Sequence, residues 1–276
     1  MRMMLLAGVT LLLTGVLAEP QANPADIDDW RGKTVLVFVP HPDDELALTG
    51  TLTKLIKGGN TVYLVQVTNG DKGSRDPRMT SQRIAAIRHQ EDLAAGKAIG
   101  LRPENILWLG YQDGELEYAP QRELVEKVCR LVRKYRPDAI FTMDPGAVYT
   151  RWIKIDHRMT ALVTVDGVRA AAYPLYFPAQ RIKEGLQPFT AREVFFWNSD
   201  RPNYRVDITS VIDQKLEAAY QHTSQAGKGN LHYTGSEMDP VDRATVRARH
   251  AIRDNDERIY ESFRRLENPL AEWNET

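Results

Sequence analysis

Apolar runs of strand length alternate with segments of helical periodicity through the first two thirds of this chain. The apolar runs are rich in β-branched residues and occupy 34–39, 61–68, 106–109 and 138–143. The segments with helical spacing follow them at 46–57, 80–100, 121–135 and 156–172. Continuous apolar strands are typical of a parallel sheet covered on both faces. The order predicts an α/β fold, a Rossmann-like and mostly parallel sheet with helices on both faces.

The last third of the chain is less regular. We expect strands at 194–197 and 204–208 and helices at 211–223 and 239–266. No internal repeat and no linker long enough to divide the chain is found in the sequence. A chain of this length buries about 75% of its unfolded surface and can build a core without disulfides. Residues 30–276 are therefore predicted to form a single domain.

Charge and cysteine content exclude several classes of protein. The 36 Lys and Arg residues balance 37 Asp and Glu residues, so no basic field attracts nucleic acid, and none is expected as a partner. The single cysteine, Cys129, cannot form an intramolecular disulfide or a cysteine-rich zinc site. Any metal must be held by histidines and carboxylates.

The N-terminus has the pattern of a secretory signal. A basic residue, Arg2, precedes sixteen uncharged residues that end in the small residue Ala18. We predict a signal peptide at 1–18 and a short tether at 19–29. The apolar run falls short of the roughly 20 residues that span a membrane, so cleavage is favoured over an uncleaved anchor, which remains the alternative. The mature protein is expected to be secreted or periplasmic, with no stable membrane span.

Polar side chains gather in the loops that follow the predicted strands. His41, Asp43 and Asp44 follow the first strand, Asp113 follows the third, and His157 follows the fourth. Because ligands bind at the carboxyl ends of the strands in such sheets, these loops predict a metal site there. Two histidines and one carboxylate leave a zinc position open for water, and a second aspartate can act as general base.

The cluster after the first strand also has a simpler interpretation. Aspartates are common helix caps, and a single histidine in a loop is usually solvated. Asp44 or Glu45 could neutralise the positive end of the helix that begins at Leu46. The presence of His157 at a second strand end favours the metal site over this alternative.

Several short motifs in a fixed order resemble a known family. They are Pro-His-Pro-Asp-Asp-Glu at 40–45, Thr-Asn-Gly-Asp-Lys-Gly at 68–73, Arg-His-Gln-Glu at 88–91, Leu-Gly-Tyr-Gln-Asp-Gly at 109–114, Arg-Pro-Asp at 136–138 and Asp-His-Arg at 156–158. With a C-terminal segment that includes Val206–Thr209 and His222, they cover roughly 33–226. Together they resemble the LmbE-like, or PIG-L, family of zinc-dependent N-acetylglucosamine de-N-acetylases.

This resemblance implies roles for individual residues. It assigns Zn²⁺, or another divalent metal, to His41, Asp44 and His157, and the general base to Asp43. Arg88 and Asp113 match positions that line the sugar pocket in relatives. For Arg88 the alternative is an ion pair on the helix surface with Glu91 or Asp92, and for Asp113 it is a turn residue. The other histidines are expected not to be ligands, with His222 the most plausible exception.

Lys154 departs from the family pattern. The family often has a histidine three residues before its last zinc ligand, where it stabilises the oxyanion of the tetrahedral intermediate. A lysine can stabilise an oxyanion as a point charge, but it does not reproduce the proton transfer of a histidine. We assign Lys154 this catalytic role, with Arg151 or Trp152 as alternatives.

The resemblance implies hydrolysis of an acetamide. Zinc would lower the pKa of a bound water to about 7, and Asp43 would take its proton as acetate and a free amine form. The expected partner is an N-acetylglucosamine-type sugar or glycoconjugate, outside the cytoplasm if the signal is cleaved. The alternatives are an inactive sugar-binding relative, and a hydrolase of another amide or an ester on the same metal site.

Overall fold

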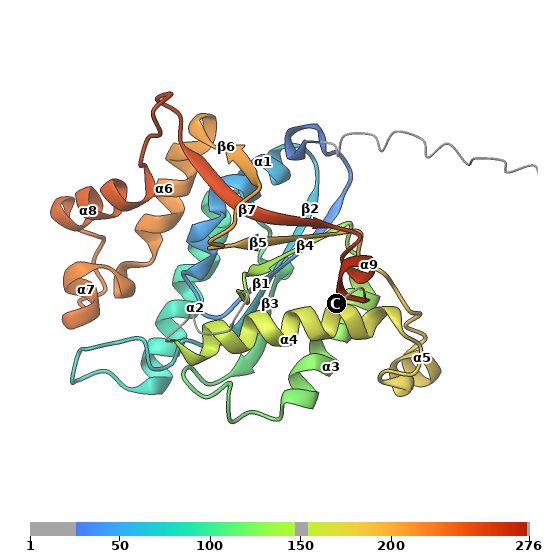
Figure 1. Cartoon of the computed structure of the whole chain (residues 1–276). Helices are drawn as coiled ribbons and strands as arrows, with labels where there is room; N and C mark the ends of the chain where they lie inside the picture. Colours follow the sequence, from blue (N-terminus) through green and yellow to red (C-terminus); the bar gives the residue numbers. More distant parts are fainter. Residues whose placement is uncertain (1–25, 147–153, 275–276) are drawn as a thin grey trace, which may run out of the picture.

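The computed structural model describes residues 26–146 and 154–274. In this part of the chain seven strands form one sheet in the order β3-β2-β1-β4-β5-β7-β6 (Figure 1). The strands are β1 Thr34–Val39, β2 Thr61–Thr68, β3 Ile106–Tyr111, β4 Ala139–Met143, β5 Glu193–Trp197, β6 Tyr204–Asp207 and β7 Tyr260–Glu267. Strands β1 to β5 pair in parallel, and β7 runs antiparallel to both of its neighbours. The predicted mostly parallel sheet is confirmed.

The helices follow the sheet in the expected alternation. The α-helices are α1 Thr49–Lys57, α2 Ser81–Ala98, α3 Gln121–Tyr135, α4 Ile155–Ala172, α5 Pro178–Glu184, α6 Ile212–Gln221, α7 Gly227–Leu231, α8 Pro240–His250 and α9 Pro269–Asn274. Short 3₁₀ turns include η2 Asp44–Ala47 and η5 Thr223–Gln225. No helix among the described residues is both long enough and apolar enough to cross a membrane. The predicted signal peptide, 1–18, and most of the tether, 19–29, lie outside the described residues.

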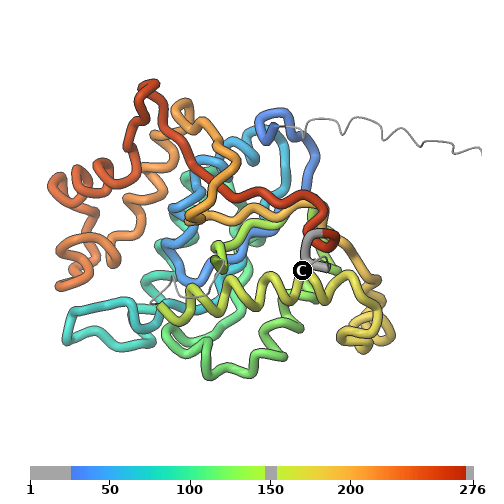
Figure 2. The backbone as a smooth tube through the Cα atoms, in the orientation of Figure 1, coloured from blue at the N-terminus to red at the C-terminus, as the bar shows by residue number. Residues whose placement is uncertain are grey.

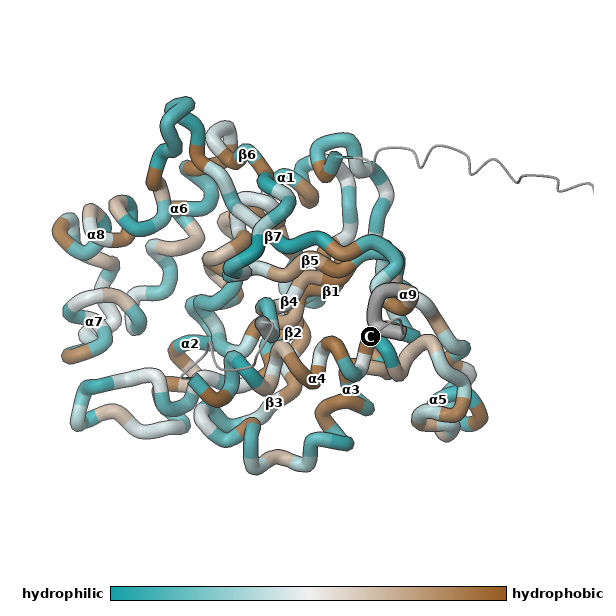
Figure 3. The backbone as a smooth tube through the Cα atoms, in the orientation of Figure 1, coloured by the Kyte–Doolittle hydropathy of each residue, from teal (hydrophilic) through white to brown (hydrophobic). Residues whose placement is uncertain are grey.

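Helices cover both faces of the sheet. Alternate side chains of β1 enter two separate cores, with Val35 and Val37 in one and Leu36 and Phe38 in the other. The first core packs against α1, α2 and α6, and the second packs against α3 and α4. Figure 3 shows hydrophobic residues concentrated in the central strands, as well as on single turns of several helices. Each fully buried side chain of this kind contributes about 1.5–3 kcal/mol, so the two cores fix the strands that carry the site.

The predicted helix at 239–266 is wrong in its second half. The chain forms α8 to His250 and then the strand β7. Buried positions alternate along β7, but two of them are charged: Glu261 pairs with Lys215 at 2.5 Å, and Arg265 pairs with Glu193 at 2.7 Å. Because charged residues occupy inward positions, the hydrophobic period of a strand is hidden in the sequence.

The first four strands end at one edge of the sheet. The loops after β1, β2 and β3 and the beginning of α4 meet there, as the chain trace in Figure 2 shows. The 3₁₀ turn η5 is joined to this edge through α2, because Glu91 accepts hydrogen bonds from the Thr223 hydroxyl at 2.9 Å and the Ser224 amide at 2.7 Å. Segments that are far apart in sequence are thus brought around a single site.

Candidate metal centre

The loop after β1 folds back so that Asp44 faces His41. The Asp44 carboxylate accepts a hydrogen bond from the His41 amide at 3.0 Å and lies 2.9 Å from His41 Nδ1. The Asp44 amide in turn donates to the His41 carbonyl at 3.1 Å. This tight turn holds an imidazole and a carboxylate in contact.

His157 reaches the same carboxylate from the first turn of α4. Its Nε2 lies 3.3 Å from Asp44 Oδ2, and its ring centroid lies 5.2 Å from that of His41. The three side chains each offer one ligand atom, and these atoms lie within 4.8 Å of one another. All three predicted metal ligands are therefore brought together.

The donor set suits a divalent cation. Burial tends to raise the pKa of Asp44, but hydrogen bonds from His157 and His41 outweigh it and hold the pKa well below its usual range. Asp44 is therefore an ionised carboxylate between two imidazoles. One carboxylate oxygen and two imidazole nitrogens form a three-ligand set of the kind that catalytic zinc sites use.

A second candidate group surrounds the other nitrogen of His41. Nε2 of this ring lies 3.0 Å from Asp156 and 3.1 Å from Asp113. The Asp156 carboxylate already accepts hydrogen bonds from the Gly114 amide at 2.5 Å and the Leu116 amide at 3.2 Å. Asp156 thus serves better as the outer carboxylate that orients a metal-bound histidine than as a ligand.

This role of Asp156 was not predicted from the sequence. The available signal was its position directly before His157 at the start of a helix. Asp113, expected to line a sugar pocket or to be a turn residue, contacts His41. Burial tends to raise the pKa of Asp113, but the hydrogen bond to His41 and the charges of His41 and Arg88 together outweigh burial and lower this pKa.

Asp43 lies next to Asp44 in the chain but is not one of the three residues whose ligand atoms converge. Its φ of 121° is unusual for a residue with a side chain, and its amide donates to the Glu45 carboxylate at 2.8 Å. Although 32% of its side chain is exposed, surrounding protein desolvates the carboxyl. This burial raises the pKa of Asp43 to about 6; Arg88 opposes the shift, and Asp44 reinforces it. A carboxyl with such a pKa can accept and return a proton near neutral pH.

Arg88 is buried under the site, with 3% of its side chain exposed. The guanidinium donates to the Asp43 carboxylate at 3.0 Å, to the Gly70 carbonyl at 3.1 Å and to the Pro42 carbonyl. A Cβ at Gly70 would lie 2.5 Å from Arg88 Nη1, and one at Gly73 would be closer still. The two glycines of the loop after β2 therefore make room for this guanidinium. The alternative of a surface ion pair between Arg88 and Glu91 or Asp92 is wrong.

Replacing Arg88 by lysine is expected to lower the free energy of unfolding by about 1–3 kcal/mol. Lysine keeps the charge but cannot donate to two carbonyls and a carboxylate in one plane, so buried acceptors lose their partners. Denaturant unfolding of both proteins measures the difference. Arg83→Lys is the control, because Arg83 lies on the exposed face of the same helix, and equal stability of the two variants would contradict this role for Arg88.

His222 and Glu45 form a buried pair close to Asp43. This pairing was not predicted from the sequence. His222 Nε2 lies 2.8 Å from Glu45, and both side chains are almost fully buried. Burial tends to lower the pKa of His222, but the charge of Glu45 and its hydrogen bond outweigh this and raise the pKa to about 9. From the sequence, Glu45 is expected to neutralise the positive end of a helix. Instead it joins the loop after β1 to the end of α6.

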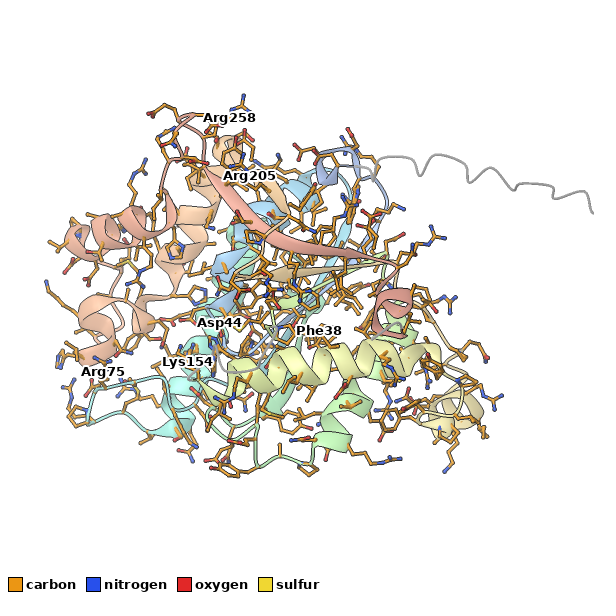
Figure 4. All side chains as sticks on the ribbon, in the orientation of Figure 1. Phe38, Asp44, Arg75, Lys154, Arg205 and Arg258 are labelled. Atoms are coloured by element: carbon orange, nitrogen blue, oxygen red, sulfur yellow. The ribbon has the colours of Figure 1, made fainter. Side chains whose placement is uncertain are left out.

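The site opens into a cavity of about 410 Å³. Its lining includes His41, Asp43, Arg88, Asp113, Lys154 and Gln225. Lys154 is exposed and stands at the beginning of α4, at the same end of the sheet as Asp44 (Figure 4). The alternative residues for the role of Lys154, Arg151 and Trp152, lie outside the described residues. Gln225 donates to the Gly73 carbonyl at 3.0 Å, so the loop after β2 and η5 form one wall of the cavity.

Known proteins share both the sequence pattern and the fold. A family model described as GlcNAc-PI de-N-acetylase, PIG-L, matches residues 36–168. Diacetylchitobiose deacetylase of Thermococcus kodakarensis is 32% identical over 194 residues, 70% of each chain. The solved structure of N,N'-diacetylchitobiose deacetylase from Pyrococcus horikoshii superposes with a TM-score of 0.72 at 28% identity, over 87% of this chain and 85% of that one.

A further solved structure shows how far the fold extends. GalB, the 4-carboxy-2-hydroxymuconate hydratase of Pseudomonas putida, has a TM-score of 0.63 at 18% identity, over 85% of this chain and 96% of that one. At that identity the likeness shows the fold alone. The relative from Thermococcus kodakarensis and the ordered motifs are more specific and confirm the resemblance found in the sequence. The chain belongs to the PIG-L family of de-N-acetylases.

Proposed function

We propose that this protein is a metal-dependent hydrolase that removes the acetyl group from N-acetylglucosamine-type substrates. The observation that carries the proposal is the pair of adjacent aspartates with different surroundings. Asp44 lies between two histidines, whereas Asp43 faces the cavity with a pKa near 6. One carboxylate can hold a metal while the other moves a proton.

The residues of the chain divide the reaction between them. His41, Asp44 and His157 would hold a divalent metal, for which we propose zinc, and such a metal supplies an acidified water and a polarised carbonyl. Asp43 accepts the proton of the attacking water on its carboxylate and returns it to the nitrogen of the leaving amine. Arg88 holds the Asp43 carboxylate in place, and Asp156 orients the His41 ring. Lys154, at the cavity wall, adds positive charge where negative charge develops on the carbonyl oxygen.

The substrate class follows from the relatives and the cavity. The relatives from Thermococcus kodakarensis and Pyrococcus horikoshii are diacetylchitobiose deacetylases. A cavity of about 410 Å³ lies within the range of small-molecule sites, and its polar lining suits a sugar. We further propose an amino sugar or glycoconjugate outside the cytoplasm, because the apolar run before Ala18 has the pattern of a cleaved signal.

Metal removal provides the test of this function. Purified protein should release acetate from diacetylchitobiose, lose this activity after dialysis against a chelator, and regain it with stoichiometric Zn²⁺. Release of acetate that persists in fully metal-free protein would contradict a metal-dependent reaction. An acetate ester tested in parallel separates amide from ester hydrolysis, and hydrolysis of the ester alone would overturn the de-N-acetylase assignment.

A further inference from the structure

The backbone of Asp43 adopts a conformation that residues with side chains rarely take. Its φ is 121° and its ψ is −18°. A residue stays in such a region only where the surrounding structure holds it there. The next residue, Asp44, faces His41 and His157, whereas Asp43 lines the cavity of the metal site. The different roles of the two adjacent aspartates therefore depend on the backbone at Asp43.

The peptide between Pro42 and Asp43 is held at both of its polar groups. Its carbonyl oxygen accepts a hydrogen bond from the Arg88 guanidinium on α2. Its N–H donates to Glu45 Oε2 at 2.8 Å. Because the two groups of a trans peptide point in opposite directions, Arg88 and Glu45 restrain this peptide from two sides. The orientation of this peptide sets φ at Asp43.

The Glu45 side chain is held in turn by His222. Glu45 Oε1 lies 2.8 Å from His222 Nε2, and both side chains are buried. A glutamate side chain has several rotamers, and only some of them place Oε2 at the Asp43 amide. The contact with His222 selects such a rotamer. His222 therefore acts on Asp43 through Glu45.

His222 takes its own position from elements outside the loop after β1. It is the C-cap residue of α6, where its amide donates to the Ala219 carbonyl at 3.3 Å. Its carbonyl accepts from the Gln225 amide at 3.1 Å. Helix α6 packs against α2, the helix that carries Arg88 (Figure 1). The two supports of the peptide before Asp43 thus come from two helices that are packed together.

Asp92 on α2 completes this buried group. Its carboxyl accepts from Gln66 Nε2 at 3.0 Å. It also lies close to Glu45 and His222, with one ligand atom of each residue within 4.8 Å of the others. Such a group could hold a metal ion, but the two oxygens of Glu45 are already engaged, one with the Asp43 amide and one with His222. These contacts favour a support for Asp43 over a second metal site.

We propose that Glu45 and His222 are positioning residues for the general base. His222 holds Glu45, and Glu45 holds the amide of Asp43, so that the Asp43 carboxyl points into the cavity of the metal site. The inference rests on the proposed function. Neither residue is among those that line that cavity or among the three metal ligands. Losing the contact should therefore slow proton transfer and lower kcat, while KM and the metal content stay at their wild-type values.

A matched pair of substitutions at His222 tests this role. Glutamine places its amide NH₂ where Nε2 of histidine lies and can still donate to Glu45, whereas the shorter asparagine does not reach. In His222→Asn, kcat with diacetylchitobiose should fall about 10–100-fold, as expected when a reacting group is misplaced, and His222→Gln should stay close to wild type. KM and metal content should be unchanged in both. Equal kcat in the two variants would contradict the positioning role.

A buried ion pair elsewhere on α6 provides the control for a general loss of stability. Lys215→Met breaks the pair with Glu261, so it should lower Tm without lowering kcat. His222→Ala removes the same contact as His222→Asn and is the second loss variant. Thermal unfolding of each protein identifies those that are folded.

A double-mutant cycle shows whether His222 acts through the base. In Asp43→Asn the base is already lost, so adding His222→Asn should not lower kcat further. A purely structural role would instead make the two losses multiply. Multiplied losses would overturn the inference.

The backbone of Asp43 gives a readout that does not depend on activity. In a crystal structure of His222→Asn prepared without metal, Glu45 should leave the Asp43 amide, and φ of Asp43 should move away from 121°. An unchanged φ overturns the positioning role. Wild-type protein that releases no acetate, together with the backbone change in the variant, overturns the proposed function alone. Acetate release with equal kcat in His222→Asn and His222→Gln overturns the positioning role and leaves the function.

Discussion

Replacing Asp43 by asparagine is expected to lower turnover by about 10²–10⁴-fold while the metal content stays at the wild-type level. Asparagine has the size of aspartate, and its carbonyl oxygen can still accept the hydrogen bond from Arg88. It cannot take a proton from the attacking water or return one to the leaving amine. Because Asp43 is not one of the three converging ligand residues, the site should still bind its metal. Steady-state kinetics with diacetylchitobiose, together with metal analysis of the same samples, measures both quantities.

A matched control separates the loss of a base from a general effect of the substitution. Asp213 is exposed on α6, away from the lining of the site, so Asp213→Asn should leave turnover and metal content unchanged. Wild-type turnover in Asp43→Asn would exclude Asp43 as the base. Loss of the metal together with turnover would instead make Asp43 part of the metal site.

The position of the site could be predicted from the sequence because two general features of parallel sheets apply together. Continuous apolar strands mark the centre of a parallel sheet, and chemistry gathers where such strands end. His41 and Asp44 belong to one loop, so the turn that joins them is local. His157 lies more than a hundred residues further along the chain, and only the predicted pairing of parallel strands places it nearby. The convergence of the two histidines with the pair of aspartates could therefore be predicted, whereas the choice of Asp44 over Asp43 as the ligand is implied only by the resemblance to the family.

The residues around the ligands could not be assigned in the same way. The role of Asp156 depends on which ring nitrogen of His41 faces it, and that of Glu45 depends on the end of α6 reaching the loop after β1. Both are products of tertiary packing. Arg88 has the spacing of a surface ion pair on its own helix, yet it is buried because two glycines on another loop leave room for it. The periodicity of the helix sequence does not show that another loop leaves space for the Arg88 side chain.

The failure at β7 has a related cause. A strand is recognised by alternation of apolar and polar residues, and β7 places Glu261 and Arg265 at buried positions. These charges are tolerated because Lys215 and Glu193 neutralise them, and Glu261 also accepts the amides of Gly50 and Thr51 at the beginning of α1. The sequence of β7 therefore has the mixture of charged and apolar residues that is typical of a helix on the protein surface.

Replacing His157 by alanine is expected to abolish both stoichiometric metal binding and acetate release. The variant keeps only two of the three ligand groups, and it also removes a hydrogen bond that keeps Asp44 ionised. The loss of metal affinity should exceed the 10–100-fold loss that is typical when an outer residue is changed. Metal titration followed by fluorescence of a competing chelator measures this affinity, and thermal unfolding of each variant shows that it is folded.

Two further variants, Asp156→Asn and His89→Ala, provide an intermediate case and a control for the metal affinity of His157→Ala. In Asp156→Asn the new amide oxygen would still accept from the Gly114 amide but would orient His41 less strongly, so metal affinity should fall about 10–100-fold. His89 lies on α2 against Trp108, away from the ligands, and its loss should leave the metal site unchanged. We expect His89→Ala to bind the metal most tightly, Asp156→Asn less tightly and His157→Ala most weakly. This order follows only if His157 is a direct ligand and Asp156 acts through His41. Tight metal binding by His157→Ala would place the metal elsewhere, and the group formed by His41, Asp113 and Asp156 would then become the metal site.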